Sequence, residues 1–342
     1  MGSTVLMNNE CFVHDDRPGG VLKRIVYPDA GKGIEEVLAG PRRKSLERLG
    51  NLEIFYDTPP DHQEYLARIH GAHALLVGWS LPTEVMNQTP TLEVLSFTGI
   101  GAGNFIDLPA AAAQGITVCN CPGYADNTVA EHTIALLLAA ARHLPRLDAR
   151  LRDGHWDQSM LGTELGGKQL GLIGFGGIAQ RVCQLARAFD MSICVWTRNP
   201  DDARAKAHRV TFIPLDELLS TSDFVSLHVA LTDDTQHMID RTRLKQMKPG
   251  AILINTGRGE LVDETALFEA LSSQHLKAAG LDVYCSEPLP DSHPLVTLKN
   301  VVLSPHVAYH TPEANDALYE IAVDNIVRFY AGDPINVIAR PD

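Results

Sequence analysis

The chain has 342 residues, enough for about two domains of ordinary size. Hydrophobic residues make up 45% of it and charged residues 21%, which excludes a mostly disordered or fibrous protein. Its formal net charge of −13 offers no general attraction to phosphate backbones or anionic lipid, so we expect neither a nucleic-acid partner nor a membrane partner.

The cysteines and the N-terminus indicate where such a protein would reside. Six cysteines are scattered along the chain, and no group of them has the spacing of a zinc site or a disulfide framework. We therefore expect no metal site and a reducing, cytoplasmic location. No basic start followed by an apolar run opens the chain, and no apolar stretch is long enough to cross a bilayer, so we expect no signal peptide and no membrane span.

The first third of the chain alternates short apolar strands with helical stretches, which is typical of a parallel sheet covered on both faces. Strands are predicted at 23–27, 52–56, 74–77, 92–97 and 116–120, and helices at 34–49, 63–70 and 108–114. A long helix follows at 129–142, with Thr128 as its N-cap and Glu131 completing a capping box. Because this helix is apolar almost all round, we expect it to be buried between domains or subunits.

From Lys168 onwards the alternation restarts more strongly. Strands are predicted at 170–173, 192–197, 210–213, 224–229, 251–255, 278–283 and 301–303, with helices between them such as 178–189 and 264–272. This pattern predicts a second, larger doubly wound domain. A last helix is expected at 312–331, where Gly332 ends it.

A glycine-rich turn joins the first strand of this second domain to the helix after it. In the segment GLIGFGGIA, Gly174 permits a tight turn and Gly176 lets backbone N–H groups approach a diphosphate, while Ala179 is small enough for close packing of helix on strand. The N-terminus of the helix adds a partial positive charge. A glycine turn is often only a turn, but its place between strand and helix predicts dinucleotide binding.

The end of the next strand bears on which dinucleotide is bound. Units that bind NAD usually place a carboxylate there, where it accepts from the ribose hydroxyls. Here the position carries Thr197, followed by Arg198, whose planar guanidinium suits a 2′-phosphate. We expect NADP(H) to be preferred and NAD(H) to be the second choice, with a solvated surface role for Arg198 as the alternative.

Three further side chains come at or just after predicted strand ends: Arg258, Glu287 and His306. The carboxyl ends of the strands border the ligand crevice of a doubly wound sheet. An arginine can bind a carboxylate, a histidine can transfer a proton near neutral pH, and a glutamate can orient that histidine. Each alone could be structural, but the set in this order predicts a catalytic site.

Long segments of the second domain resemble one enzyme family. GLIGFGGIA, LHVALTDDT, MKPGAILINTGRGELVDE, AGLDVYCSEP and SPHVAYHT, in this order, are similar to the D-isomer-specific 2-hydroxyacid dehydrogenases, which include phosphoglycerate dehydrogenase and glyoxylate/hydroxypyruvate reductase. The resemblance runs from about Leu92 to Gly332, whereas the first twenty residues resemble no family. It implies an α/β fold of two doubly wound domains, with a Rossmann cofactor domain at 121–304 inserted into a flavodoxin-like substrate-binding domain formed by 1–120 and 305–342.

The resemblance also implies roles for single residues. Arg258 would anchor the substrate, Glu287 would partner the histidine and His306 would be the acid/base. Asp282 would position the nicotinamide carboxamide. The other residues implied at the cofactor, together with those of the glycine turn and the strand end, are Gly174, Gly176, Gly177, Ile178, Thr197, Arg198, Val229, Thr256 and Gly257. We expect backbone amides near Gly78, Trp79, Gly101 and Ala102 to help Arg258 bind the substrate carboxylate.

Two stretches depart from the family pattern. Where the family usually has H-x-P, this chain has His228-Val229-Ala230, which loosens the loop near the adenosine. Where the family usually has G-V-D-N-V-D, it has the glycine-rich stretch 101–107, which keeps free amides but changes the substrate contacts. We expect an NAD(P)H-dependent 2-oxo acid reductase that is a homodimer, with glyoxylate or hydroxypyruvate as the type of substrate. The alternative is a non-enzymatic, corepressor-like NAD(P)-binding protein, and nothing singles out a third reading, the oxidation of formate or phosphite.

Overall fold

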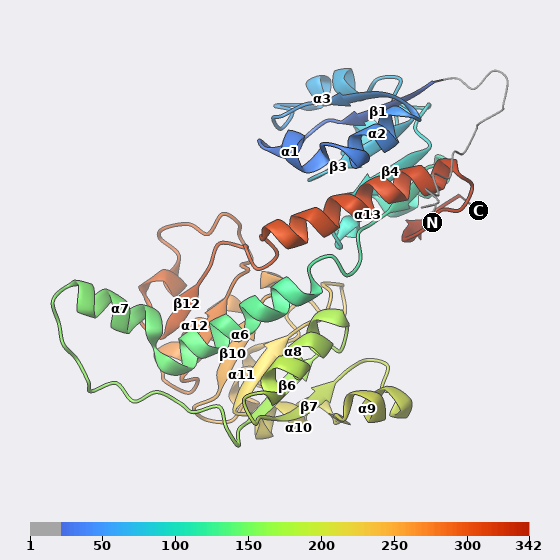
Figure 1. Ribbon diagram of the computed structural model, residues 1–342. Coiled ribbons are helices and arrows are strands. Elements are labelled where there is room, and N and C mark those ends of the chain that lie inside the picture. The colour runs from blue at the N-terminus through green and yellow to red at the C-terminus, as the bar shows by residue number, and fades with distance from the viewer. Residues whose placement is uncertain (1–21, 342) are drawn as a thin grey trace, which may run out of the picture. The chain divides into compact units, whose positions relative to one another are not determined.

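The computed structural model describes residues 22–341, which form two compact units (Figure 1). Of these residues, unit 1 contains those up to Ser96 together with 105–119 and 323–341, and unit 2 contains 97–104 and 120–322. The boundary at which the chain returns from unit 2 to unit 1 lies between 322 and 323, inside the last helix, whereas the sequence predicted it between 304 and 305. The N-terminal twenty residues, which resemble no family, lie outside the described part of the chain.

Unit 1 is built on a six-stranded sheet with the order β13-β5-β4-β3-β1-β2. Its strands are β1 (Lys23–Tyr27), β2 (Gly50–Ile54), β3 (Ala74–Val77), β4 (Val94–Phe97), β5 (Thr117–Cys119) and β13 (Val337–Ala339). Its helices are α1 (Ile34–Leu38), α2 (Pro41–Glu47), α3 (His62–Ile69), α4 (Thr83–Met86) and α5 (Leu108–Ala113). The pairs β1–β2, β1–β3 and β4–β5 are parallel, whereas β13 runs antiparallel to β5.

Two features of unit 1 differ from the sequence prediction. The single helix expected at 34–49 is wrong, because Gly40 takes a left-handed φ of 72° and Pro41 then starts a new helix. Strand β13 was not predicted, since three residues at the end of the chain carry little periodic signal.

Unit 2 is built on a seven-stranded sheet with the order β12-β11-β10-β9-β6-β7-β8, in which all the pairs are parallel. The strands are β6 (Gln169–Ile173), β7 (Ser192–Trp196), β8 (Thr211–Phe212), β9 (Phe224–Leu227), β10 (Ile252–Asn255), β11 (Ala278–Leu281) and β12 (Val301–Leu303). The helices are α6 (Asp126–Arg142), α7 (Leu144–Arg152), α8 (Gly177–Arg187), α9 (Asp202–His208), α10 (Leu215–Thr221), α11 (Arg241–Gln246), α12 (Glu264–Ser272) and α13 (Pro312–Tyr330), the last of which continues into unit 1.

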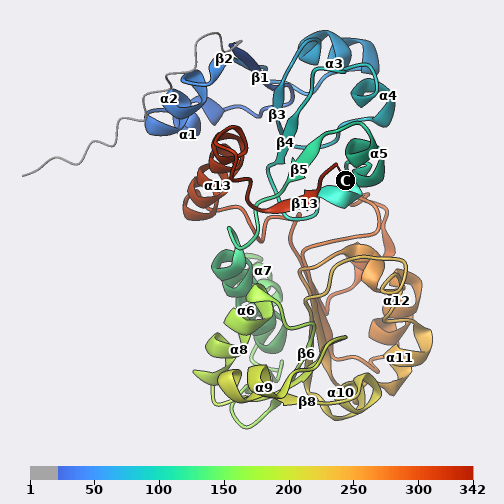
Figure 2. The ribbon, with the colours of Figure 1, turned by 90° about the vertical axis from the view of Figure 1, so that its right-hand side faces the viewer.

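Helices cover both faces of this parallel sheet (Figure 2). Apolar side chains of α10, α11 and α12 pack on one face, and those of α6 and α8 pack on the other. The strand order reverses between β9 and β6, which makes the carboxyl ends of the central strands the expected ligand crevice. The predicted fold class is confirmed: both units are α/β sheets, and most of unit 2 is inserted into the chain of unit 1.

Helix α6 is the long apolar helix of the sequence analysis, but it begins three residues earlier than predicted. Its N-cap is Ala125, which makes no side-chain cap bond, and Thr128 instead places its hydroxyl 3.4 Å from that of Thr311. The expected capping box is therefore wrong. The helix buries one face inside unit 2, against α8, β10 and β11. No helix in the described part of the chain is long and apolar enough to cross a membrane.

Candidate active site

The glycine turn links β6 to α8 in unit 2, as predicted. Gly174 has a φ of 97°, and a Cβ there would overlap the carbonyl of His228, so only glycine fits this position. A Cβ at Gly176, by contrast, would meet nothing within 4 Å, which leaves the mouth of the turn open. Helix α8 then starts at Gly177 without a side-chain cap. An open turn before an uncapped helix N-terminus fits the diphosphate of a dinucleotide.

Two arginines gather where β7 ends. Arg198 follows Thr197, is 57% exposed and lies 3.3 Å from the carboxylate of Asp234. Arg204 of α9 was not predicted to take part, because no motif marks it. Its guanidinium lies over the ring of Phe175 in the glycine turn, 5.8 Å from the ring centroid, and donates to a backbone carbonyl at 2.6 Å. This end of the site therefore holds two guanidinium groups, one of them paired with a carboxylate.

The remaining predicted cofactor residues surround the same sheet edge. Ile178 is in the first turn of α8, and the side chain of Val229, just after β9, approaches Gly174. After β10, Thr256 shares a hydroxyl contact of 3.0 Å with Thr133, and the N–H of Gly257 donates to the Asn255 side chain at 3.0 Å. The topology thus brings these residues to one edge. Their contact with a cofactor stays a prediction.

His228 is the histidine of the stretch that corresponds to the family's H-x-P motif. Its Nε2 lies 2.9 Å from the hydroxyl of Ser226 in the buried strand β9. Burial lowers the pKa of His228 to about 4, so the ring is neutral near pH 7. Where the motif's proline is missing, Thr235 holds the loop by donating to the carbonyl of Ala230 at 2.7 Å.

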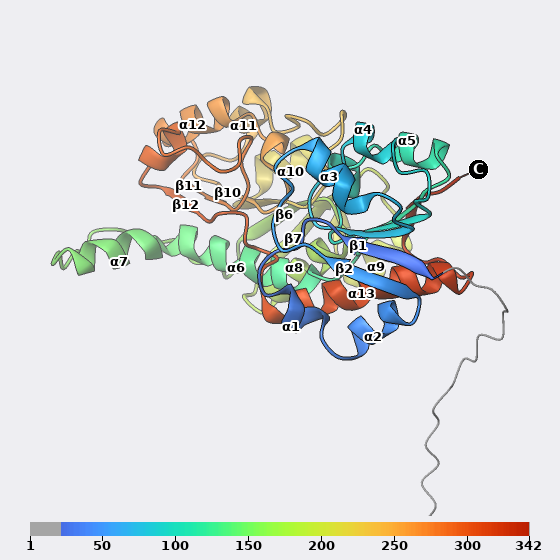
Figure 3. The same cartoon turned by 90° about the horizontal axis from the view of Figure 1, so that it is seen from above.

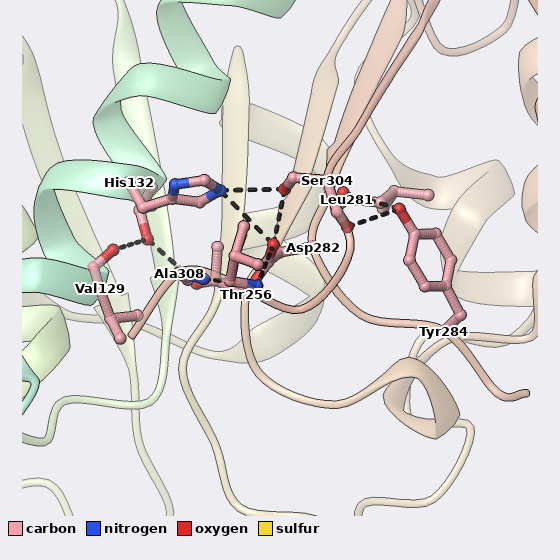
Figure 4. Close-up of polar contacts among 10 residues, drawn as sticks. Val129, His132, Thr256, Leu281, Asp282, Tyr284, Ser304 and Ala308 are labelled. Atoms are coloured by element: carbon pink, nitrogen blue, oxygen red, sulfur yellow. Dashed lines mark hydrogen bonds and ion pairs between the residues drawn. The ribbon is translucent and has the colours of Figure 1, made fainter. Parts of the chain in front are cut away.

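Asp282 follows β11 and is fully buried at the centre of a polar network (Figure 4). It accepts from the Ser304 hydroxyl at 2.6 Å and from the backbone amides of Val307 and Ala308 at 3.0 and 2.9 Å. His132 of α6 places Nε2 2.9 Å from the Ser304 hydroxyl and 3.5 Å from an Asp282 oxygen. Burial alone would raise the pKa of Asp282, but these hydrogen bonds outweigh it and hold the pKa below its ordinary value.

This network shapes the loop that carries the candidate acid. Asp282 holds the backbone on the C-terminal side of His306, and its own carbonyl accepts from the His306 amide at 2.8 Å. His306 itself has a φ of 52°, a left-handed conformation that is uncommon for a residue with a side chain. We conclude that Asp282 positions the loop. The predicted contact of Asp282 with a nicotinamide carboxamide stays a prediction.

His306 and Glu287 form a direct pair. Nδ1 of the imidazole lies 2.7 Å from Oε2 of the carboxylate, and the other carboxylate oxygen accepts from the Tyr284 amide at 2.9 Å. Both side chains are partly exposed. Nδ1 is thereby fixed as a donor, and Nε2 has no hydrogen-bond partner among the described residues. The geometry leaves Nε2 to exchange a proton with a bound ligand.

Arg258 follows β10, and its backbone is held tightly. Asn255 donates to its carbonyl at 2.8 Å, and the next residue, Gly259, has no room for a Cβ because the Tyr284 backbone fills that space. The guanidinium donates to the carbonyl of Gly257 at 2.7 Å and stays half-exposed. A Cβ at Gly101 would lie only 2.9 Å from Arg258 Nη2, so the predicted substrate residue Gly101 packs directly against this arginine.

The three predicted catalytic residues meet at one edge of the seven-stranded sheet. Arg258 follows β10, Glu287 follows β11 and His306 follows β12, and these strands are consecutive neighbours and parallel. Strand order therefore places residues that are distant in sequence at the same edge of the sheet, as the predicted site requires. No group of three or more metal-ligating side chains that could hold a metal occurs among the described residues.

The amides of Gly78 and Trp79 in unit 1 correct one expectation. They follow β3 and donate to the carboxylate of buried Asp29 at 3.0 and 2.8 Å, so they are not free to bind a substrate carboxylate. Burial raises the pKa of Asp29, and these two amides and Arg68 offset only part of that rise. Ala102, also expected to offer an amide, donates to the carbonyl of Ile100 at 3.1 Å.

Comparison with known proteins agrees with this geometry. Residues 134–308 match the family described as D-isomer specific 2-hydroxyacid dehydrogenase, NAD binding domain. A glyoxylate reductase from Korarchaeum cryptofilum is 37% identical over 302 residues, covering 86% of this chain and 91% of that protein. The chain belongs to this family.

Other family members show how far the likeness extends. A D-3-phosphoglycerate dehydrogenase from Mycobacterium tuberculosis is 39% identical over 84% of this chain, which spans only 55% of that relative's length. The solved structure of an NADPH-dependent glyoxylate/hydroxypyruvate reductase from Sinorhizobium meliloti, in complex with NADP and malonate, superposes with a TM-score of 0.79 at 30% identity, covering 93% of this chain and 97% of that one. The residues that match the family's NAD binding domain, 134–308, lie within unit 2.

Proposed function

We propose that this 2-hydroxyacid dehydrogenase reduces small 2-oxo acids to 2-hydroxy acids with a reduced nicotinamide cofactor. The contact between His306 and Glu287 is the observation that carries the proposal, because it orients the ring and leaves Nε2 free. Arg258 at the same sheet edge supplies the cation that a substrate carboxylate needs. The names of the relatives support an enzyme rather than the non-enzymatic alternative.

Each of the three side chains has one task in the reaction. Arg258 binds the substrate carboxylate through its guanidinium and sets the orientation of the carbonyl. When bound, the nicotinamide supplies the hydride that C2 receives. Protonated His306 gives its Nε2 proton to the C2 oxygen as negative charge develops there, so that one hydride and one proton reduce the carbonyl to a hydroxyl. Glu287 stabilises the imidazolium and keeps Nδ1 as the donor to its carboxylate.

Glyoxylate and hydroxypyruvate are the substrates that we propose first. Relatives named glyoxylate reductase and glyoxylate/hydroxypyruvate reductase support this choice. A spectrophotometric screen of glyoxylate, hydroxypyruvate, pyruvate and bulkier 2-oxo acids with NADPH and NADH tests it. We expect cofactor oxidation to be fastest with one of the first two acids. Absence of turnover with every acid would favour the non-enzymatic NAD(P)-binding role.

We further propose that NADP(H) is preferred over NAD(H). Support comes from the arginine at the end of β7, where a carboxylate for the ribose hydroxyls is missing. Arg198 now pairs with exposed Asp234, an interaction that a 2′-phosphate can replace at little cost. A charge-assisted contact of this kind contributes roughly 1.5–3 kcal/mol, or about ten- to a hundred-fold in binding.

Replacing Arg198 with alanine should therefore raise the KM for NADPH by about ten- to a hundred-fold and leave the KM for NADH nearly unchanged. Asp234→Asn should act in the opposite direction, because it frees the guanidinium. Arg241→Ala, which removes an equal charge from a surface pair with Glu269, is the control. A higher kcat/KM with NADH in the wild type, or equal losses for both cofactors in Arg198→Ala, would contradict this preference.

We also propose a homodimer, although not through the buried face of α6. The neighbouring helix α7 has no buried residue, and it projects from the rest of unit 2 (Figure 3). Large apolar side chains on it and on the segment after it are exposed: Leu144, Leu151, Trp156 and Leu161. These four exposed side chains, which we call the apolar patch, support an interface with a second copy.

Light scattering at micromolar concentration should give the mass of a dimer. Leu151→Lys combined with Trp156→Ser should shift the mass toward a monomer, because both changes remove apolar area from the patch. Val296→Ser, at an exposed apolar residue elsewhere in unit 2, should leave the mass unchanged. A monomeric wild type would rule out the proposed assembly.

A further inference from the structure

Asp126 occupies an unusual place beside the dinucleotide turn. It is the first residue of α6, and α6 packs along α8 (Figure 2). A Cβ added to Gly177, the first residue of α8, would overlap the Asp126 carboxylate. The carboxylate therefore lies against the very start of the helix whose N–H groups fit a diphosphate.

This carboxylate is partly buried. Among the described residues, no side chain or backbone N–H forms a hydrogen bond or ion pair with it. The charged residues on the facing turns are engaged elsewhere: Arg181 of α8 donates to Asn127 at 2.7 Å, and Glu131 of α6 accepts from the same asparagine at 2.7 Å. Burial raises the pKa of Asp126, and no charged group acts against that rise.

A negative charge at this position opposes the binding of another negative charge. The N-terminus of α8 attracts anions through its dipole and its unpaired N–H groups, and the cofactor diphosphate needs that attraction. The Asp126 carboxylate lies in the same positive electric field of the α8 N-terminus, but it accepts no hydrogen bond from the N–H groups there. Even at the dielectric constant of bulk water, two unit charges about 4 Å apart repel strongly enough to change binding about five-fold.

We propose that Asp126 weakens the binding of the nicotinamide cofactor by repelling its diphosphate. This inference rests on the cofactor site described above. Because the effect acts on the part that NADPH and NADH share, it lowers the affinity for both by the same factor and is independent of the 2′-phosphate. It also makes binding sensitive to pH, since protonation of Asp126 removes the repulsion.

The test is direct titration of the whole protein with ADP-ribose, which carries the diphosphate but neither a nicotinamide nor a 2′-phosphate. Asp126→Asn and Asp126→Ser should both bind it at least about five-fold more tightly than the wild type at neutral pH. Adenosine, which lacks the diphosphate, should bind all the variants equally. Glu131→Gln loses the same charge from the same helix and should stay within about two-fold of the wild type.

The pH dependence gives a second readout. The affinity of the wild type for ADP-ribose should rise as the pH is lowered from neutral toward the pKa of Asp126, because the protonated side chain is neutral. Both Asp126 variants should lack this rise. A wild-type affinity that does not rise, unchanged or weaker binding by the variants, or an equal gain for adenosine would overturn the inference. If the wild type does not bind ADP-ribose at all, the proposed cofactor site is wrong as well.

Discussion

Replacing His306 with glutamine should lower kcat for 2-oxo acid reduction at least about 10²-fold, the usual scale of acid–base catalysis. Glutamine cannot give a proton to the C2 oxygen, although it can still bond to Glu287. Binding of the reduced cofactor should stay nearly intact, because the glycine turn lies on β6 and the histidine follows β12. Steady-state kinetics together with a fluorescence titration of the cofactor measure both quantities.

Two further variants make this prediction specific. Glu287→Gln should lower kcat less than His306→Gln, because an uncharged amide still accepts from Nδ1 but stabilises the imidazolium less. His310→Gln changes an exposed histidine of the same loop and should leave kcat within about two-fold. A kcat near that of the wild type in His306→Gln would disprove the assignment of the proton donor.

Arg258→Gln should raise the KM for the 2-oxo acid by about ten- to a hundred-fold. Its guanidinium is the only cation that we assign to the substrate carboxylate. The amide of glutamine has neither the positive charge of the guanidinium nor its paired donors. Asn255 holds the backbone at this position, so the substitution should leave the fold intact. The measurement is a substrate titration at saturating cofactor, with a thermal melt as the check on folding.

Arg258→Lys is the matched variant, because it keeps the positive charge but loses the planar pair of N–H donors. Its KM should fall between those of the wild type and Arg258→Gln. If both variants keep the KM of the wild type, the substrate carboxylate is bound by other groups and the role given to Arg258 is wrong.

The sheet and the edge that carries the proposed catalytic residues could be predicted because their signals are local. Each strand is a short apolar run, and the glycine turn needs a residue without a Cβ at Gly174. Arg258, Glu287 and His306 each come shortly after such a run. In a parallel sheet the ends of neighbouring strands share one edge, so local positions were enough to predict a common site.

Other features of the two units depend on contacts that no local pattern reveals. Asp29 reaches the amides after β3 from a loop that follows β1. His132 contacts Ser304 across a long stretch of chain, and only the packing of α6 on the sheet brings them together. The early start of α6 at Asp126 was missed because a capping pattern at Thr128 competed with it.

The most direct test of the proposed reaction is to identify its product. The protein is incubated with hydroxypyruvate and reduced cofactor, and the configuration of the resulting glycerate is determined by chiral chromatography. We predict that the wild type forms the D-isomer in step with cofactor oxidation, and that His306→Gln forms it at least about 10²-fold more slowly. Formation of the L-isomer would contradict the account. So would the absence of glycerate, if glyoxylate and the other 2-oxo acids are also left unreduced.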